Sequence, residues 1–274
     1  MCAAARSPLT RVAIIGVTGR MGQALLRAAP AFPQLLITGA VASADSLALG
    51  RDAGELSGGA RANLAVTCDL TAALAQADVA IDFSTAAAAA ANLKACRTAR
   101  KPLLLGTTGH GEAPGMALAE AARDIALLIA PNTSVGVALL VELTRRAAAV
   151  LPAGFDIDVL ELHHRTKRDA PSGTALALGE AAAGARGLAF PPPSRPAGSL
   201  RMEGEIGFAS VRAGDTVGEH TVLFSGAGEQ LSLTHRASDR AIFARGALAA
   251  ALWLASQPPG RYGMSEFLGL KTGT

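Results

Sequence analysis

The stretch from Glu161 to Thr174, ELHHRTKRDAPSGT, is the part of the sequence whose residue types point most directly to chemistry. His163, His164 and Lys167 can transfer protons or donate hydrogen bonds, and neighbouring arginines add positive charge. The Pro-Ser-Gly-Thr that follows is typical of a helix start, where free backbone amides bind a carboxylate. The segment therefore predicts a pocket for a small anion beside proton-transferring groups. Its composition alone leaves a solvated basic loop open as the alternative.

Metal chemistry is a second possibility at this segment, because two adjacent histidines are common metal ligands. No cysteine or carboxylate at metal-ligand spacing completes such a site in the sequence, so we expect no metal. The cysteines Cys2, Cys68 and Cys96 are widely spaced and form no CxxC motif. This usage is typical of a reducing compartment and favours the cytoplasm.

A glycine-rich segment near the N-terminus has the context of a nucleotide-binding loop. It lies between a short apolar run, Arg11 to Ile15, and a predicted helix, Met21 to Ala29. Glycines there permit a tight turn and let backbone amides approach a pyrophosphate at the start of the helix. The expected contacts are Gly16, Val17, Thr18, Gly19, Arg20 and Met21. The spacing is GxxGxxG rather than GxGxxG, so glycines that only turn the chain remain an alternative.

The position that usually binds the adenine ribose is unusual in this sequence. An acidic residue is expected at the end of the second strand, about 20 residues after the glycine loop. Ser43 stands at that position, and Asp45 follows two residues later. The sequence therefore leaves the choice between NADH and NADPH open.

The elements that must position these residues follow two patterns. In the first half, strand-like runs alternate with helical stretches, which predicts a Rossmann-type parallel sheet covered on both faces. The predicted strands are 11–15, 34–41, 64–67, 79–83, 102–106 and 125–130, and the predicted helices between them include 85–99 and 113–124. After Asn132 the pattern changes to α+β with an open antiparallel or mixed sheet. Helices are expected at 135–150 and 172–183, the latter capped by Ser172, and strands at 155–163, 206–212, 220–225 and 230–235.

These patterns predict an α/β protein of two domains. Residues 1–133 form a dinucleotide-binding domain, which a C-terminal segment from about 239 to 274 completes. Residues 134–238 form a substrate-binding and oligomerisation domain, with an irregular proline-rich loop around Pro191 to Pro196.

Bulk composition excludes two classes of partner. The net charge of +3 over 274 residues is too small to indicate nucleic-acid binding. No apolar run reaches the roughly 20 residues of a membrane-spanning helix, so we expect no membrane segment.

The segment HHRTKRDAPSGTAL resembles the signature of dihydrodipicolinate reductases, E-x-H-H-x-x-K-x-D-x-P-S-G-T-A. Further segments resemble the family's motifs in the same order along nearly the whole chain. They are GVTGRMG (16–22), DAGEL (52–56), IDFS (81–84), GTTG (106–109), APNTSVGV (130–137) and IGFASVRAGDTVGEH (206–220).

This resemblance implies reduction of a cyclic unsaturated dicarboxylate, dihydrodipicolinate or its 4-hydroxy precursor, to tetrahydrodipicolinate by NADH or NADPH, in lysine and diaminopimelate biosynthesis. It implies that His163 is the acid/base histidine and Lys167 the proton donor. It assigns the substrate carboxylates to His164, Gly173 and Thr174, and further dinucleotide contacts to Gly106, Thr107, Thr108, Ala130, Pro131, Asn132 and Thr133. It also implies a homotetramer. The alternatives are another small-substrate dehydrogenase with the same nucleotide domain, or an inactive nucleotide-binding regulator.

Overall fold

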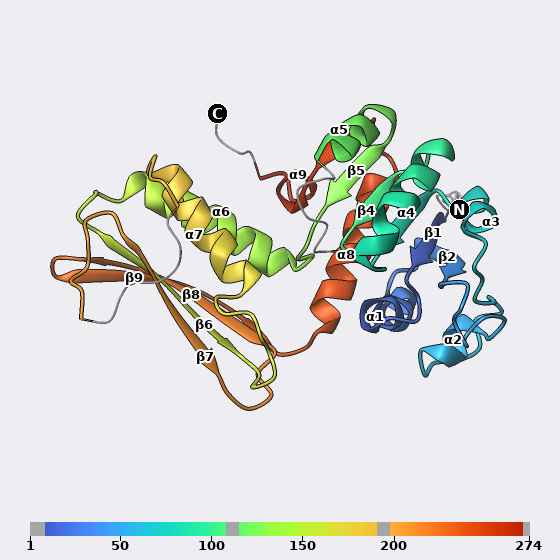
Figure 1. Ribbon diagram of the computed structural model, residues 1–274, viewed down its shortest axis with the longest axis horizontal. Helices are drawn as coiled ribbons and strands as arrows, with labels where there is room; N and C mark the ends of the chain where they lie inside the picture. The colour runs from blue at the N-terminus through green and yellow to red at the C-terminus, as the bar shows by residue number, and fades with distance from the viewer. Residues whose placement is uncertain (1–8, 108–114, 191–197, 271–274) are drawn as a thin grey trace, which may run out of the picture. The chain divides into compact units, whose positions relative to one another are not determined.

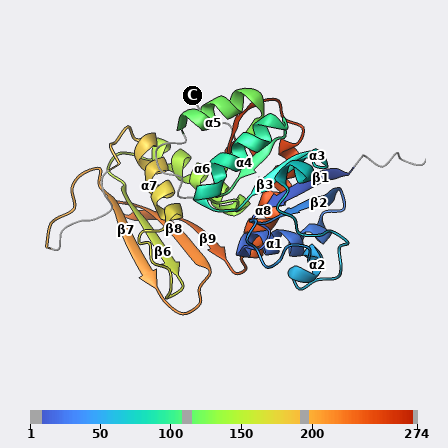
Figure 2. The ribbon, with the colours of Figure 1, turned by 45° about the vertical axis from the view of Figure 1, so that its right-hand side comes forward.

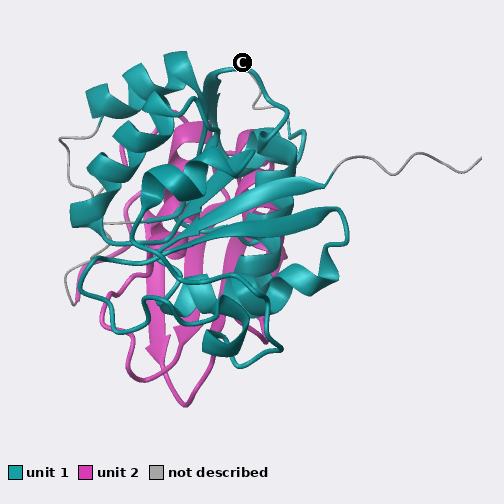
Figure 3. Cartoon of the chain, turned by 90° about the vertical axis from the view of Figure 1, so that its right-hand side faces the viewer, with its two compact units in different colours: residues 1–134, 241–271 teal, residues 135–240, 272–274 magenta. Residues whose placement is uncertain are grey.

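The computed structural model describes residues 9–107, 115–190 and 198–270. The chain divides into two compact units (Figure 3): unit 1 comprises residues 1–134 and 241–271, and unit 2 comprises residues 135–240 and 272–274. The expected proline-rich loop falls on residues 191–197, which lie outside the described residues. None of the described helices is both long and apolar enough to cross a membrane.

Unit 1 is built on a parallel sheet whose strands follow the order β10-β5-β4-β3-β1-β2. Its strands are β1 (Thr10–Ile15), β2 (Leu35–Val41), β3 (Val79–Asp82), β4 (Leu103–Leu105), β5 (Ala126–Ile129) and β10 (Gly260–Tyr262). Its helices are α1 (Arg20–Ala28), the 3-10 turn η1 (Ala29–Ala31), α2 (Ala53–Leu56), α3 (Leu70–Ala75), α4 (Ala86–Thr98), α5 (Gly115–Asp124), α8 (Ala241–Leu254) and α9 (Met264–Phe267). The predicted Rossmann-type fold is confirmed.

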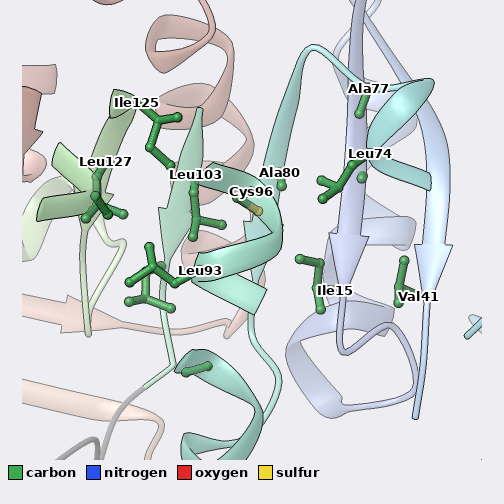
Figure 4. Packing of buried hydrophobic residues seen from close by; sticks show 14 of the residues in the cluster. Ile15, Val41, Leu74, Ala77, Ala80, Leu93, Cys96, Leu103, Ile125 and Leu127 are labelled. Carbon is green, nitrogen blue, oxygen red and sulfur yellow. The ribbon is translucent and has the colours of Figure 1, made fainter. Parts of the chain in front are cut away.

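Apolar side chains cover both faces of this sheet. On one face, alternate strand residues such as Ile15 and Leu103 pack against Leu74 of α3 and Leu93 of α4 (Figure 4). On the other face, α8 packs on β3, β4 and β5 and against α1. The last long helix is thus a part of unit 1, although it follows unit 2 in the sequence.

One predicted strand is wrong. Residues 64–67 form only the isolated bridges Val41–Thr67 and Asp52–Ala65. The reason is the Asp52 carboxylate, which accepts hydrogen bonds from the amides of Ala62 at 2.9 Å and Leu64 at 3.1 Å. The Val66 amide likewise donates to the Arg51 carbonyl, so residues 62–66 pair with this segment and only Thr67 bonds to β2. The sixth strand is β10, which the sequence pattern did not predict.

Unit 2 is a mixed sheet with two helices on one face (Figures 1 and 2). The strand order is β7-β6-β8-β9, with β6 parallel to β7 and antiparallel to β8. The strands are β6 (Asp156–His163), β7 (Ile206–Arg212), β8 (Gly218–Gly226) and β9 (Glu229–Ala237), and the helices are α6 (Val135–Val150) and α7 (Gly173–Ala185). Buried side chains of β6 and β8, such as Val159 and Phe224, pack against Leu178 of α7. The prediction was an antiparallel or a mixed sheet, and the parallel pairing of β6 with β7 shows that it is mixed.

Candidate active site

The glycine-rich loop joins β1 to α1 at the carboxyl end of the parallel sheet. Gly16 has a φ of +84°, and a Cβ there would lie 2.6 Å from the carbonyl oxygen of Phe83. A Cβ on Gly22 would lie 2.4 Å from the carbonyl oxygen of Gly16. Both positions therefore require glycine, because a Cβ at either one would clash with backbone atoms and force the loop to move. The start of α1 at Arg20 follows directly, so its amides are in the right setting to bind a phosphate.

The fully buried carboxylate of Asp82 ties two neighbouring loops together at the same sheet edge. It accepts hydrogen bonds from the Ser84 amide at 2.7 Å, from Asn92 Nδ2 at 2.9 Å and from the Thr107 hydroxyl at 3.2 Å. The loop after β3 is thereby fixed to the loop after β4. Sequence reasoning did not assign a role to Asp82 or Asn92.

The structure gathers most of the predicted nucleotide contacts at this edge. Loops at the carboxyl ends of adjacent parallel strands lie side by side. The contacts are Gly16 to Met21 after β1, Ser43 after β2, Gly106 and Thr107 after β4, and Ala130 to Thr133 after β5. Thr108 lies outside the described residues.

The segment after β2 contains an unexpected contact between the two residues considered for the ribose. The Ser43 side chain hydrogen-bonds to the Asp45 carboxylate and is the main cause that holds the pKa of Asp45 below its ordinary value. Both residues are exposed. An ionised carboxylate therefore lies beside the hydroxyl at the position that was expected to bind the ribose.

In unit 2, strand register aligns polar side chains in a row across the sheet. Along β6 the buried residues alternate, which places Glu161 and His163 on the face that α7 covers. Glu161 pairs with Ser210 of β7 and with His220 of β8, and His220 pairs with His235 of β9. We call Ser210, Glu161, His220 and His235 the polar row.

Glu161 is the centre of this row. Its carboxylate accepts hydrogen bonds from His163 Nδ1, from Arg212 Nη2 at 2.6 Å and from the Ser172 amide at 3.2 Å. Burial acts to raise the pKa of Glu161, but hydrogen bonds from Arg212, Ser210 and His163 outweigh it, so the pKa lies below its ordinary value. Glu161 is therefore an anion at neutral pH.

The two buried histidines are neutral at neutral pH. Burial lowers the pKa of His163, and the opposing effect of Glu161 does not restore it. Burial also lowers the pKa of His220 to about 4, with a smaller contribution from His163. The rings of His163 and His220 meet edge to face, with their centroids 5.0 Å apart.

The loop from His164 to Ser172 carries the remaining predicted residues. Lys167 Nζ forms an ion pair with Asp169 Oδ2 at 2.8 Å, and the Lys167 amide donates to the His164 carbonyl at 3.1 Å. The predicted helix cap is confirmed, because Ser172 Oγ accepts a hydrogen bond from the Ala175 amide at 3.2 Å.

Two of the three predicted substrate residues lie at the start of one helix. Gly173 and Thr174 form the first turn of α7, and Gly173 is exposed. Ser172, which caps this turn, hydrogen-bonds through its hydroxyl to His220 Nε2 at 3.0 Å. His163 is linked to the same cap through Glu161.

Three side chains of this cluster, Glu161, His163 and His220, are also of metal-ligating types and offer ligand atoms within 4.8 Å of one another. The Glu161 carboxylate, however, is already bound by the guanidinium of Arg212, by an imidazole N–H and by an amide. A metal cation at this place would have to displace or adjoin the Arg212 cation. The arrangement favours proton chemistry over metal binding.

Sequence reasoning missed Glu161, Arg212 and His220 as functional residues. The available signal was the alternation in Glu161-Leu162-His163, which puts the carboxylate and the imidazole on one face of a strand. Arg212 and His220 come from other strands, and only the strand order brings them to this face.

Family models match both the N-terminal and the C-terminal part of the chain. Residues 10–133 match the model of the dihydrodipicolinate reductase N-terminus, and residues 136–268 match that of its C-terminus. A 4-hydroxy-tetrahydrodipicolinate reductase of Anaeromyxobacter dehalogenans is 46% identical over 97% of this chain and 100% of its own. One from Alkalilimnicola ehrlichii is 49% identical over 95% of this chain and 99% of its own.

A solved structure shares the fold over nearly the full length. The dipicolinate-bound dihydrodipicolinate reductase from Paenisporosarcina sp. TG-14 gives a TM-score of 0.75 at 24% identity, covering 94% of this chain and 98% of that one. An amine dehydrogenase from Mycobacterium smegmatis gives a lower TM-score of 0.60 at 14% identity, covering 93% of this chain and 95% of that one. With both family models matched and relatives of nearly half identity over almost the whole length, the chain belongs to the dihydrodipicolinate reductase family.

Proposed function

We propose that this protein reduces 4-hydroxy-tetrahydrodipicolinate to tetrahydrodipicolinate with NADH or NADPH, in lysine and diaminopimelate biosynthesis. The observation that carries the proposal is the buried His163, hydrogen-bonded to Glu161, which also binds the cap of α7, in a chain of this family. The overall change removes the 4-hydroxyl as water, adds one hydride to the resulting conjugated imine, and takes up one proton.

The nucleotide fits the glycine cradle at the carboxyl edge of the parallel sheet. Gly16 and Gly22 let the loop pack tightly against its own backbone, where a Cβ would clash, and the start of α1 offers amides to the pyrophosphate. Loops held together by Asp82 would bind the nicotinamide end, through Gly106 and Thr107. When bound, the nicotinamide supplies the hydride.

The residues of unit 2 bind the dicarboxylate and handle its proton. Gly173 and Thr174 would bind one carboxylate at the helix start, and His164, from the loop before α7, would donate a further hydrogen bond to the substrate. Lys167, a cation paired with Asp169, supplies the proton that balances hydride addition. His163 enters as a neutral imidazole, so it accepts a proton or a hydrogen bond during the reaction.

For the cofactor we propose dual use, with selectivity within about tenfold, or roughly 1.4 kcal/mol. Ser43 offers no charge to repel the extra phosphate of NADPH, and Arg20 in the glycine loop could pair with it. The carboxylate of Asp45 beside Ser43 favours NADH instead, since it can accept hydrogen bonds from the ribose hydroxyls. Comparing kcat/KM for the two cofactors at one salt concentration checks this. A preference of several hundredfold for NADH would show that Asp45 dominates.

A coupled assay tests the reaction itself. The 4-hydroxy substrate is generated by its synthase from pyruvate and aspartate semialdehyde, and nicotinamide absorbance is followed with each cofactor. We expect oxidation of either cofactor only when the synthase is present. Oxidation with aspartate semialdehyde alone would indicate a different small-substrate dehydrogenase. Tight cofactor binding without turnover would indicate an inactive regulator.

We further propose a cytoplasmic homotetramer that joins through unit 2. The face of its sheet opposite α6 and α7 carries Leu160 and Val211, which are 37% and 52% exposed. Apolar groups in such a position favour association with another copy. Light scattering in solution would measure the number of chains. We expect neither a nucleic acid nor a membrane as partner.

A further inference from the structure

The guanidinium of Arg212 touches both sides of the proposed proton-handling site. Its Nη2 donates to Glu161 Oε1 at 2.6 Å and to the carbonyl oxygen of Asp169 at 2.5 Å. Glu161 holds His163, and the Asp169 carboxylate holds Lys167 at 2.8 Å. One nitrogen therefore links the residues that hold His163 and Lys167.

Glu161 restricts His163 further by the atom to which it binds. Because an ionised carboxylate only accepts hydrogen bonds, its contact with Nδ1 requires the proton to be on that nitrogen. In the neutral ring, Nε2 then carries the lone pair. The Nε2 edge lies against Gly218, where a Cβ would come within 2.9 Å of that nitrogen. The ring is thus confined between Glu161 and the Gly218 backbone.

We propose that Glu161 and Arg212 are positioning residues: Glu161 fixes the tautomer and orientation of His163, and Arg212 fixes Glu161 and the Lys167 loop relative to each other. The proposal rests on the proposed function, in which His163 and Lys167 handle the proton. A purely structural role is the competing explanation, since losing one partner of a buried ion pair also destabilises a fold.

Two variants separate these explanations. Glu161→Gln keeps the shape and removes the anion, and Arg212→Lys keeps the charge on a side chain that is one bond shorter, so its nitrogen no longer reaches both acceptors. We expect kcat to fall by about 10- to 100-fold in each, the size of loss seen when the carboxylate that orients a metal-bound histidine is removed, with KM changed by less than about threefold. If Glu161→Gln does not fold, Arg212→Lys still tests the proposal through its kcat. Unchanged kcat in a folded variant of either residue would overturn the proposal.

The matched control is Glu142→Gln. Glu142 is another buried carboxylate of unit 2, paired with Arg145 at 2.9 Å and Arg146 at 2.6 Å within α6. We expect this change to lower the melting temperature and leave kcat unchanged. An equal loss of kcat in Glu142→Gln and Glu161→Gln would assign both losses to the fold and overturn the proposal.

A double mutant shows whether Glu161 acts through His163. In a His163→Ala background, adding Glu161→Gln should cost less than about threefold in kcat, because the residue that it positions is gone. If the two losses multiply, Glu161 acts by another route and the proposal fails.

A measurement without turnover keeps this test separate from the reductase assay. The ring proton of His163 is followed by NMR against pH, and its signal is assigned with His163→Ala. Since the anion of Glu161 acts to raise the pKa of His163, Glu161→Gln should move the titration to lower pH. An unmoved titration would overturn the positioning role even in an active enzyme. Absent turnover in the wild type would overturn the proposed function, yet leave this readout intact.

Discussion

His220 makes the stability of unit 2 depend on pH in a way that can be calculated. The residue is 4% exposed, and burial lowers its pKa from 6.5 to about 4. Its other neighbours are His163, His235 and Lys167, which lower the pKa, and Glu161, which raises it. Because the unfolded chain binds a proton near pH 6.5 and the folded chain does not, stability falls as the pH drops from about 6.5 towards 4. Above pH 6.5 this group contributes no pH dependence.

The magnitude follows from the difference between the two pKa values. At about 1.4 kcal/mol for each pH unit, a difference of about 2.5 corresponds to a loss of about 3 kcal/mol once both states are protonated. By pH 5 about 2 kcal/mol of this should already be lost. Such a loss is a large part of the stability of an ordinary domain.

The assay compares the wild type with His220→Gln, which can still hydrogen-bond to Ser172. Urea unfolding is followed by far-UV circular dichroism between pH 7.5 and 5. Fluorescence of Trp253, the single tryptophan, follows unit 1 separately. We expect the wild type to lose about 2 kcal/mol more than the variant over this range. His235→Gln, at a half-buried histidine of the same row, should remove less of the pH dependence. Equal pH slopes in the wild type and His220→Gln would refute the reasoning.

Three further results are expected. Lys167→Ala should lower kcat by on the order of 100-fold, typical of a lost general acid, with an unchanged melting temperature; near-normal turnover would remove Lys167 from the proton step. Thr174→Val should raise KM and weaken competition by pyridine-2,6-dicarboxylate with little change in kcat, and unchanged inhibition would place the carboxylate elsewhere. Gly22→Ala should weaken NADH binding in a fluorescence titration, because its Cβ would meet the Gly16 carbonyl oxygen at 2.4 Å; unchanged affinity would show that the loop adapts.

Much of unit 1 could be predicted because local patterns determine it. Short apolar runs that end in glycine or a polar residue gave β1, β3, β4 and β5 within one or two residues. The exceptions have local causes as well. Residues 64–67 contain apolar side chains suited to a strand, but the Leu64 amide donates to the Asp52 carboxylate and the Val66 amide to the Arg51 carbonyl. β10 has only three residues, Gly260–Tyr262, too few for any period to be visible.

The polar row could not be predicted for a different reason. β7 and β8 follow one another with only residues 213–217 between them, which favours a hairpin. Instead β6, more than 40 residues earlier than β7, lies between them and pairs with both. Glu161 thereby meets Ser210 on one side and His220 on the other. Such pairing depends on contacts between strands that are far apart in the sequence, and the hydrophobic period within one strand does not reveal it.

The place of the row within unit 2 also explains how the fold tolerates it. Val159 and Val222 are fully buried in the apolar cluster beneath α7, whereas Glu161 and His220, two residues away on β6 and β8, are polar. The change from apolar to polar side chains along β6 and β8 occurs where α7 begins, because Glu161 and His220 bind the amide and the hydroxyl of its cap, Ser172. Burying ionised groups is costly unless hydrogen bonds satisfy them, and a helix start supplies unpaired amides for that purpose. In the proposed function a substrate carboxylate binds at this same helix start, so α7 would both stabilise the buried Glu161 carboxylate and position the substrate.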